Sequence, residues 1–510
     1  MAKRTILDKD LKRIVQLEKA TATVGQSKIN LGLSVLFLIG VLIFAAFQTT
    51  GLEGSAVLIA AAIIGGYMAL NIGANDVANN VGPAVGSKAI TLLGALLIAA
   101  FFEAAGAIIA GGDVVTTISK NIIDPNVISD KDTFIWAMMA ALLAAAIWVN
   151  IATYVGAPVS TTHAVVGGVL GAGVAAAGVA AVNWPVMAKI AASWIISPVL
   201  GGLIAAGFLG FAKFFILYQE DKLTAARKWV PVLVAILACA FSVYLVMKGL
   251  KRVWKPDPTM IGLIAVGAFA IAYALVRPAV AKAAASMPNK RKSVSDLFTI
   301  PLICAAALLS FAHGANDVAN AVGPLAAIVS AVTAGTVAAK VTLPIWVLIV
   351  GAIGISIGLM LYGPKVIEIV GEKITKLNRV RAFCVALSAA ITVIIASTLG
   401  LPVSSTHIAV GGVFGVGFLR EYLANKKKPL AAAIIYSESS GGPVDWQQVS
   451  ADGEAAPAST AISPKKEAKA AKRKLVRRRH LMTIIAAWVI TVPAAAILSG
   501  VIFMILRELF

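Results

Sequence analysis

One polar phrase occurs twice in an otherwise apolar chain. Gly-Ala-Asn-Asp-Val-Ala-Asn-Asn-Val-Gly-Pro spans residues 73–83 and Gly-Ala-Asn-Asp-Val-Ala-Asn-Ala-Val-Gly-Pro spans residues 314–324, so ten of eleven positions are identical. An Asp side chain at the centre of a membrane-spanning segment costs about 2.5–3.5 kcal/mol on insertion scales, and such residues usually serve a function. Paired polar interruptions in two halves of a chain are typical of the binding site of a secondary transporter.

A second phrase, rich in hydroxyl groups, is also duplicated. Pro158-Val-Ser-Thr-Thr-His163 corresponds to Pro402-Val-Ser-Ser-Thr-His407, and a Gly-Gly pair follows each copy. Proline followed by hydroxyl residues and an apolar run predicts a helix start, whose free N–H groups and positive dipole end attract an anion. N-capping alone would explain one copy, but two copies, each about 85 residues after an Asn-Asp phrase, favour an anion site. The two His residues are expected to cap or hydrogen-bond rather than to carry protons.

The polar phrases contain no Arg or Lys. With both Asp residues ionised, a bound doubly charged oxyanion would bring the local charge to roughly −3 to −4, which a low-dielectric site cannot hold uncompensated. Carboxylate and amide oxygens are hard ligands, so the candidate Na⁺ ligands are Asn75, Asp76, Asn316 and Asp317. The carboxyl groups could instead take up protons. The missing fixed positive charge therefore predicts that Na⁺ or H⁺ travels with the anion.

Two further titratable residues lie near the phrases but are not duplicated. Glu103 is deep in an apolar run, and we expect either a coupling or gating role or a buried, protonated carboxyl group. Its positional counterpart in the second half is Ile355. His313 precedes the second Asn-Asp phrase, but Ile72 stands in the first, which argues against a symmetric ligand role.

The composition predicts a membrane protein. Of 510 residues, 59% are hydrophobic and 13% are charged, and the mean hydropathy is +0.89. Continuous runs of about 20 apolar residues recur, long enough to cross about 30 Å of hydrocarbon as helices. The three Cys residues have no metal-ligand spacing, and no nucleophile elbow or Walker loop is present. No enzymatic activity and no cofactor are therefore expected.

The charge pattern indicates how the halves are oriented. The net charge of +20 does not point to nucleic acid, because Lys and Arg mark the cytoplasmic loops of membrane proteins. Loop 112–132 carries four Asp against two Lys, a net of −2, whereas the equivalent loop 363–381 carries five basic residues against two Glu, a net of +3. These loops are therefore predicted to lie on opposite faces, which makes the halves inverted repeats. The basic loop 248–255 fits this topology poorly.

The run pattern predicts an all-α polytopic membrane protein. We expect about twelve transmembrane helices in two inverted-topology repeats, with broken helices and two re-entrant hairpins near 157–181 and 401–420. The expected segments are, in order, a cytoplasmic amphipathic N-terminal segment (1–28), an extra N-terminal span (29–50), a first transport repeat (51–216), a connector with two spans (217–296), a second transport repeat (297–425), a disordered basic cytoplasmic loop (426–480) and a C-terminal span (481–510). The basic tract before the last span could contact anionic lipid headgroups.

With both phrases duplicated, the sequence resembles the PiT inorganic phosphate transporter family, and looks most like its bacterial phosphate permeases. The resemblance runs from about Gly51 to Arg420 and implies a symporter that moves phosphate with Na⁺ or H⁺ by alternating access. It places the protein in the bacterial cytoplasmic (inner) membrane with a cytoplasmic N-terminus. The residues that it places around the substrate and ions are Asp76, Asn79, Asp317 and Asn320, with Ser160, Thr161, Thr162, Ser404, Ser405 and Thr406 facing the phosphate from the hairpins. Glu103 matches the Glu of a Phe-Glu-x-x-Gly element in relatives.

One departure from the family leaves the coupling ion and its stoichiometry open. Where some members place a second Glu, this chain has Val385-Ala386-Leu387. A permease of the same fold for sulfate or another tetrahedral oxyanion is the alternative, and an anion channel or receptor is the alternative from another class. Channels line their pores with fixed charge or carbonyl rings, whereas the polar groups here cluster in two phrases. The expected partners are phosphate, the coupling cation and the lipid bilayer, with a homodimer possible and no nucleic acid.

Overall fold

The structure is a computed structural model that describes residues 27–124, 127–128, 130–155, 159–249, 254, 256–337, 343–373, 377–440 and 478–510. Within these residues the chain is helical apart from turns and one isolated bridge between Ile123 and Val182. Eleven described helices are long and apolar enough to cross a membrane, close to the predicted number of about twelve. The N-terminal segment before residue 27 lies outside the described residues.

The described helices follow one another along the chain, and residues 441–477 between the last two lie outside the described residues. Their bounds are Ser27–Gln48 for the first described helix, then Ser55–Gly86 (α2), Leu92–Ala110 (α3), Gly112–Thr116 (α4), Lys131–Tyr154 (α5), Thr161–Ala177 (α6), Trp184–Ala212 (α7), Lys222–Tyr244 (α8), Pro258–Ala284 (α9), Arg291–Leu297 (α10), Thr299–Ala334 (α11), Ile345–Lys373 (α12), Arg379–Thr398 (α13), Ser405–Ser440 (α14) and Arg478–Leu509 (α16). Short π-helical turns follow α4, α7 and α8 at 117–121, 213–217 and 245–249.

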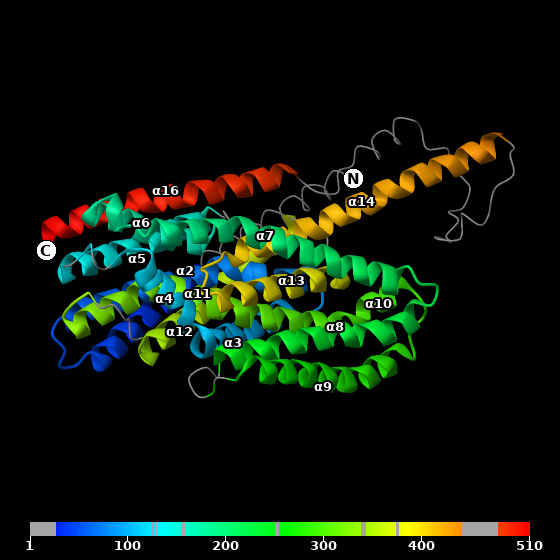
Figure 1. The fold of residues 1–510 in the computed structure, drawn as a ribbon, viewed down its shortest axis with the longest axis horizontal. Coiled ribbons are helices and arrows are strands. Elements are labelled where there is room, and N and C mark those ends of the chain that lie inside the picture. The colour runs from blue at the N-terminus through cyan, green and yellow to red at the C-terminus, as the bar shows by residue number, and fades with distance from the viewer. Residues whose placement is uncertain are drawn as a thin grey trace, which may run out of the picture.

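Helix α11 forms the centre of the bundle. Buried residues make up 83% of its most apolar stretch but 0% of that of α9. In Figure 1, α9 runs along one edge of the bundle and α16 along the opposite edge, with α11 between them. The side chains along the apolar length of α9 are therefore not covered by other helices, whereas those of α11 face other helices.

Helices α2 and α11 cross in opposite directions at the two Asn-Asp phrases. Gly65 of α2 faces Ala321 and Leu325 of α11, whereas Asp76 further along α2 faces His313 earlier on α11. Residue numbers thus rise along one helix as they fall along the other. This antiparallel crossing is the arrangement expected of inverted repeats.

Equivalent glycines let α2 and α11 each approach a further helix closely. Gly314 lies against the backbone of Glu103 on α3, and Gly73 lies against the backbone of Ile355 on α12. A Cβ atom at either position would collide with the backbone carbonyl oxygen of its partner. Small residues at such positions let helix backbones approach closely. Glu103 and Ile355 are therefore structural counterparts, as their sequence positions predict.

The Asn-Asp phrases do not interrupt the helices that carry them. Helices α2 and α11 run through both phrases, with Pro83 and Pro324 inside them. A continuous helix satisfies its own backbone groups, and neighbouring helices allow proline to be tolerated within a membrane. The polar interruption therefore consists of side chains rather than of exposed backbone.

The hydroxyl phrases lie at the tips of two helical hairpins. One hairpin consists of α5 and α6 and the other of α13 and α14, so each extends further toward the N-terminus than the predicted regions 157–181 and 401–420. As predicted, each phrase begins a helix: Ser160 accepts a hydrogen bond from the His163 amide at 3.1 Å, and Ser404 accepts one from the His407 amide at 3.3 Å.

Each hairpin packs against a helix from the other half of the chain. Helix α7 follows α6 in sequence but packs on α14, where Gly411 lies against the backbone of Pro198. Helix α16 follows α14 in sequence but packs on α6, where Gly167 lies against the backbone of Val492. The C-terminal span is thus the counterpart of α7, and the two repeats exchange their last helices.

Two charged segments differ from the sequence-based expectations. Residues 426–440 continue α14 as a helix, although they belong to the segment predicted to be disordered, and residues 441–477 lie outside the described residues. In the basic loop that fits the topology poorly, Lys248 forms an ion pair with Asp113 and donates to the carbonyl oxygen of Thr398 at 3.1 Å. The charge of this lysine is therefore compensated locally.

Candidate functional site

The Asp76 carboxylate is bonded by one hydroxyl group from each hairpin. Thr161, in the first turn of α6, donates to Oδ2 at 3.0 Å, and Thr406, in the first turn of α14, donates to Oδ1 at 3.0 Å. The helix starts place these hydroxyls at the hairpin tips, where they reach the face of α2 that carries Asp76. A single carboxylate thus joins both halves of the chain.

The Asp317 carboxylate has the equivalent partners from the opposite halves. Ser405 of α14 donates to Oδ2 at 2.9 Å, and Thr162 of α6 lies 3.3 Å from Oδ1. Thr162 also donates to the carbonyl oxygen of Val403 at 3.0 Å. The two carboxylates and four hydroxyls therefore form a nearly symmetric polar cluster.

Two amide side chains complete this cluster. Asn79 donates to the Thr406 hydroxyl at 2.8 Å. Asn320 donates to the Thr162 hydroxyl at 3.0 Å and to Oδ1 of Asp317 at 2.9 Å. The structure thus brings together all eight of the predicted Asp, Asn and tip hydroxyl residues, while Ser160 and Ser404 serve as the helix caps beside them.

The remaining candidate cation ligands turn toward the other arms of the hairpins. Asn75 donates to the hydroxyl of Thr153 on α5 at 2.9 Å, and Asn316 donates to the hydroxyl of Ser397 on α13 at 2.9 Å. The Oδ1 atom of Asn75 is buried and has no hydrogen-bond partner among the described residues. Its lone pairs are therefore available to a cation or to a donor.

His313 lies inside the cluster, although the sequence reading did not select it as a site residue. Its Nε2 atom is 2.7 Å from Oδ2 of Asp317 and 3.8 Å from Oδ2 of Asp76, and its Nδ1 atom is 3.2 Å from Oε2 of Glu103. One potential ligand atom each from Asp76, His313 and Asp317 lies within 4.8 Å of the others. The sequence does contain one indication of this contact. His313 and Glu103 both lack a counterpart in the other half of the chain, as two residues that contact each other would.

One part of the site, formed by Asn80, Glu103 and His313, has no counterpart in the inverted half of the chain. Asn80 donates to Oε1 of Glu103 at 2.7 Å, and Glu103 faces His313. In the inverted half the equivalent positions hold Ala321, Ile355 and Ile72. The cluster is symmetric where it presents hydroxyls and amides, and asymmetric where it presents Glu and His.

The site is largely buried in this conformation. Of the ten residues predicted to contact phosphate, nine are buried and Asn79 is half-buried. Among the described residues, no Lys or Arg forms a hydrogen bond or ion pair with Asp76, Asp317 or Glu103. In the folded site, too, no Lys or Arg of the described residues balances the charge of the carboxylates.

The His residues of the hydroxyl phrases lie apart from the carboxylates. Their rings lie in a row between two Trp side chains, with centroid distances of 3.8 Å from Trp194 to His163 (tilted), 4.5 Å from His163 to His407 (edge to face) and 3.5 Å from His407 to Trp488 (stacked). Trp194 and Trp488 belong to the exchanged helices α7 and α16. The four rings therefore connect both hairpins to both exchanged helices.

Taken with the fold, this site defines a class of protein. An all-helical multi-pass membrane protein, with two inverted repeats whose polar tips meet at one buried point, is a secondary transporter and not an enzyme. The chain belongs to the phosphate transporter family, whose family model matches residues 72–499.

Similar proteins agree with this membership over nearly the whole chain. A protein of Helicobacter pylori strain J99 named "Putative phosphate permease" is 46% identical over 525 aligned positions, covering 98% of each chain. A relative of the same description in Pyrococcus abyssi is 41% identical over 374 positions, covering 73% of this chain and 91% of its own length. A solved structure described as the sodium-dependent phosphate transporter matches with a TM-score of 0.76 and 34% identity, covering 89% of this chain and 100% of that one.

Proposed function

We propose that this protein is a Na⁺-coupled symporter of inorganic phosphate that works by alternating access in the bacterial cytoplasmic membrane. The observation that carries the proposal is that each buried carboxylate, Asp76 and Asp317, is bonded by hydroxyl groups of both hairpins. A change of charge at either carboxylate would therefore alter its hydrogen bonds to both halves at once. The relative that is named sodium-dependent supports the choice of Na⁺.

Phosphate would bind among the tip hydroxyls, the amides of Asn79 and Asn320, and the first-turn N–H groups of α6 and α14. The N-termini of helices offer unpaired N–H donors and a positive dipole end to an anion. In the described conformation the tip hydroxyls are bonded to carboxylates instead, and Thr162 also to the carbonyl oxygen of Val403. Each hydroxyl has a single hydrogen, so those donors must turn before they can bond to phosphate.

Binding of Na⁺ would cause the hydroxyl hydrogens to turn away from the carboxylates. A cation held by oxygens of Asp76 and Asp317, with the amide oxygens of Asn75 and Asn316 as further ligands, neutralises the carboxylates as hydrogen-bond acceptors. The hydroxyl hydrogens then bond better to the incoming anion. Cation and phosphate thereby assist each other's binding, which is the requirement for coupled transport.

Glu103 and His313 form the proposed coupling branch. They join α3 to α11 beside Asp317, so their protonation would change the charge that Na⁺ and phosphate meet. This branch also supports H⁺ as the alternative coupling ion, since both a carboxyl group and an imidazole can accept a proton.

The orientation in the membrane follows from one end of the bundle, here called the basic end, which carries Lys88, Arg291, Arg379, Arg381 and Arg420. These residues belong together because Arg379 donates to the carbonyl oxygen of Lys88 at 3.0 Å and the other three line one cavity. The positive-inside bias places this end in the cytoplasm, and the N-terminus with it.

Labelled phosphate uptake into proteoliposomes tests the proposal, with Na⁺ and H⁺ gradients imposed separately and excess sulfate as competitor. We expect accumulation under the Na⁺ gradient that sulfate does not suppress. Discrimination is expected because a carboxylate can accept a hydrogen bond from the protonated phosphate OH, which sulfate lacks, and sites built around such a bond reject analogues without it. Accumulation of sulfate but not of phosphate would overturn the substrate, and accumulation under the H⁺ gradient alone would overturn the ion.

A further inference from the structure

Asn71 lies on the same face of α2 as two residues of the transport site, although it is outside the repeated Asn-Asp phrase. Asn71, Asn75 and Asn79 are spaced four residues apart along α2, and residues at this spacing are neighbours on one helix face. Asn79 donates to the Thr406 hydroxyl at a hairpin tip, and Asn75 directly precedes Asp76. Asn71 therefore extends the polar face of the site by one further helical turn.

This face of α2 meets α5 in two polar contacts, one turn apart. The Asn150 amide donates to Oδ1 of Asn71 at 2.9 Å, and the Asn75 amide donates to the Thr153 hydroxyl at 2.9 Å. Asn71 and Asn75 are 4% and 5% exposed, whereas Asn150 is exposed. Asn71 and Asn150, here called the asparagine pair, therefore connect an exposed position on α5 to the buried site.

The asparagine pair has no counterpart in the inverted half of the chain. The contact next to it is repeated, because Asn316 donates to the Ser397 hydroxyl at 2.9 Å. At the positions equivalent to 71 and 150, however, the other half has Ala312 and Ile394. The pair is therefore not part of the framework that both repeats share. Polar side chains in membrane-spanning helices usually mark substrate or ion pathways, which suggests a role in access to the site.

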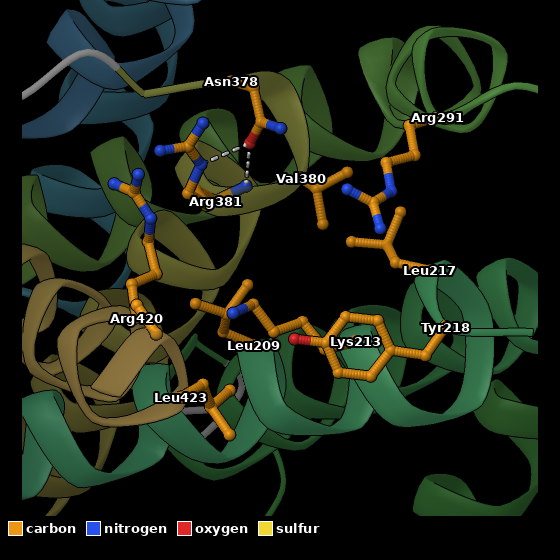
Figure 2. Close-up of a pocket in the computed structure, with 11 residues that line it drawn as sticks. Leu209, Lys213, Leu217, Tyr218, Arg291, Asn378, Val380, Arg381, Arg420 and Leu423 are labelled. Carbon is orange, nitrogen blue, oxygen red and sulfur yellow. Dashed lines mark hydrogen bonds between the residues drawn. The ribbon is translucent and has the colours of Figure 1, made fainter. Parts of the chain in front are cut away.

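The asparagine pair lies on the side of the transport site that is away from the basic end. Helix α2 ends at Gly86, close to Lys88 of the basic end, and Asn71 precedes Asp76 along this helix. Figure 2 shows the three arginines of the basic end that line one cavity. With the basic end in the cytoplasm, as proposed above, the asparagine pair lies on the extracytoplasmic side of Asp76.

The buried atom that lacks a partner beside the asparagine pair is an acceptor. Of the side-chain nitrogen and oxygen atoms of Asn71, Asn75 and Thr153, only Oδ1 of Asn75 is buried without a hydrogen-bond partner among the described residues. Such an atom is costly unless an ion or a donor binds to it. The carboxylate of Asp76 follows in the chain, and no Lys or Arg of the described residues contacts it. These groups fit a small cation that prefers oxygen ligands.

We propose that the asparagine pair and Oδ1 of Asn75 form an entry site, which holds Na⁺ on its way between the extracytoplasmic side and Asp76. The amide oxygens replace part of the hydration shell of the ion before it reaches the carboxylate. Neutral amides suit such a site, because binding along a pathway must be favourable enough for entry and weak enough for release. The identity of the ion and the direction of entry rest on the proposed function.

The double variant Asn71→Ala/Asn150→Ile tests the entry site, because it gives the pair the residues of the inverted half. In proteoliposomes we expect the Na⁺ concentration for half-maximal phosphate uptake to rise about fivefold or more, while the KM for phosphate at saturating Na⁺ stays within about twofold of wild type. Ser34→Ala is the matched control, since it removes a buried hydroxyl that contacts the Tyr362 hydroxyl at 2.9 Å in another helix contact. It should leave both values unchanged.

Asn150→Asp is the opposite change. It keeps the shape of the side chain and adds a negative charge, so the half-maximal Na⁺ concentration should fall about twofold or more. The same order is expected without transport, when Na⁺ is titrated against the Tm of the purified full-length protein in the absence of phosphate. The double variant should need more Na⁺ than wild type for a given rise in Tm, and Asn150→Asp should need less.

A Na⁺ response that wild type and both variants share would overturn the entry site. A double variant with a lower Tm but the Na⁺ dependence of wild type would also overturn it, because the pair would then be a structural contact. If the double variant does not fold, Asn150→Asp decides. A wild type that neither accumulates phosphate under a Na⁺ gradient nor changes its Tm with Na⁺ would overturn the proposed function and the entry site together, so the two failures are distinguishable.

Discussion

The Nδ1 atom of His313 lies 3.2 Å from Oε2 of Glu103, and both side chains are fully buried. The same imidazole reaches Asp317 through Nε2, at 2.7 Å. One ring therefore connects a carboxyl group on α3 to a carboxyl group on α11. Because Ile355 and Ile72 occupy the equivalent positions in the other half, only one of the inverted repeats supplies this Glu–His contact.

Glu103→Gln is expected to slow phosphate uptake about tenfold or more. The amide oxygen of Gln can still accept from Asn80, but the charge facing His313 is lost, and hydrogen bonds to charged groups are worth about 1.5–3 kcal/mol. Initial uptake rates in proteoliposomes measure the effect. Ile355→Leu, at the structural counterpart of Glu103, is the control and should keep its uptake. Wild-type uptake by Glu103→Gln would exclude the coupling role.

Asp76→Asn and Asp317→Asn are each expected to abolish coupled uptake while the protein still inserts into the membrane. Asn keeps the size and one acceptor oxygen for the tip hydroxyls, but it cannot neutralise a cation. Uptake under a Na⁺ gradient and the amount of protein in the membrane fraction are the two measurements. Asp221→Asn, at the exposed cap of α8, should behave as wild type. Full uptake by both site variants would refute the assignment.

Thr406→Val is expected to weaken phosphate binding, seen as a KM raised by about five- to tenfold. The substitution keeps the shape but removes the hydroxyl that donates to Asp76 and accepts from Asn79, and one hydrogen bond contributes about 0.5–1.5 kcal/mol. Thr406→Ser, which restores the hydroxyl, should return KM to within about twofold. If Ser were as impaired as Val, the methyl group rather than the hydroxyl would matter.

Gly314→Ala is expected to destabilise the protein by about 1–3 kcal/mol, the usual result of overpacking. The added Cβ would meet the backbone of Glu103, which cannot rotate away as a side chain can. Gly267→Ala on α9 is the matched control, because nothing lies within 4 Å of its added Cβ and Ala favours a helix by about 0.5–1 kcal/mol over Gly. Thermal unfolding in detergent measures both, and an unchanged Tm for Gly314→Ala would contradict the close crossing.

Much of the site could be predicted from the sequence because its parts are repeated phrases. Asp76 with Asn79, and Asp317 with Asn320, each share one helical turn, so local spacing already places them on one face. The helix starts at Ser160 and Ser404 also follow from local capping chemistry. The polar side chains of these phrases do not by themselves require a backbone break, because α2 and α11 continue through both phrases.

The amino-acid sequence by itself determined the helical class, the inverted halves and the identities of the polar residues, since these depend on composition, loop charge and short motifs. Only the tertiary structure decided which hydroxyl meets which carboxylate, that Glu103 and His313 form one branch, and that α7 and α16 exchange hairpins. Thr406 and Asp76 are 330 residues apart in the chain, and His313 and Glu103 are on different helices. Such partners are brought together by the packing of whole helices, as at Gly314, where α11 meets α3 beside Glu103. No local pattern encodes where two distant helices cross.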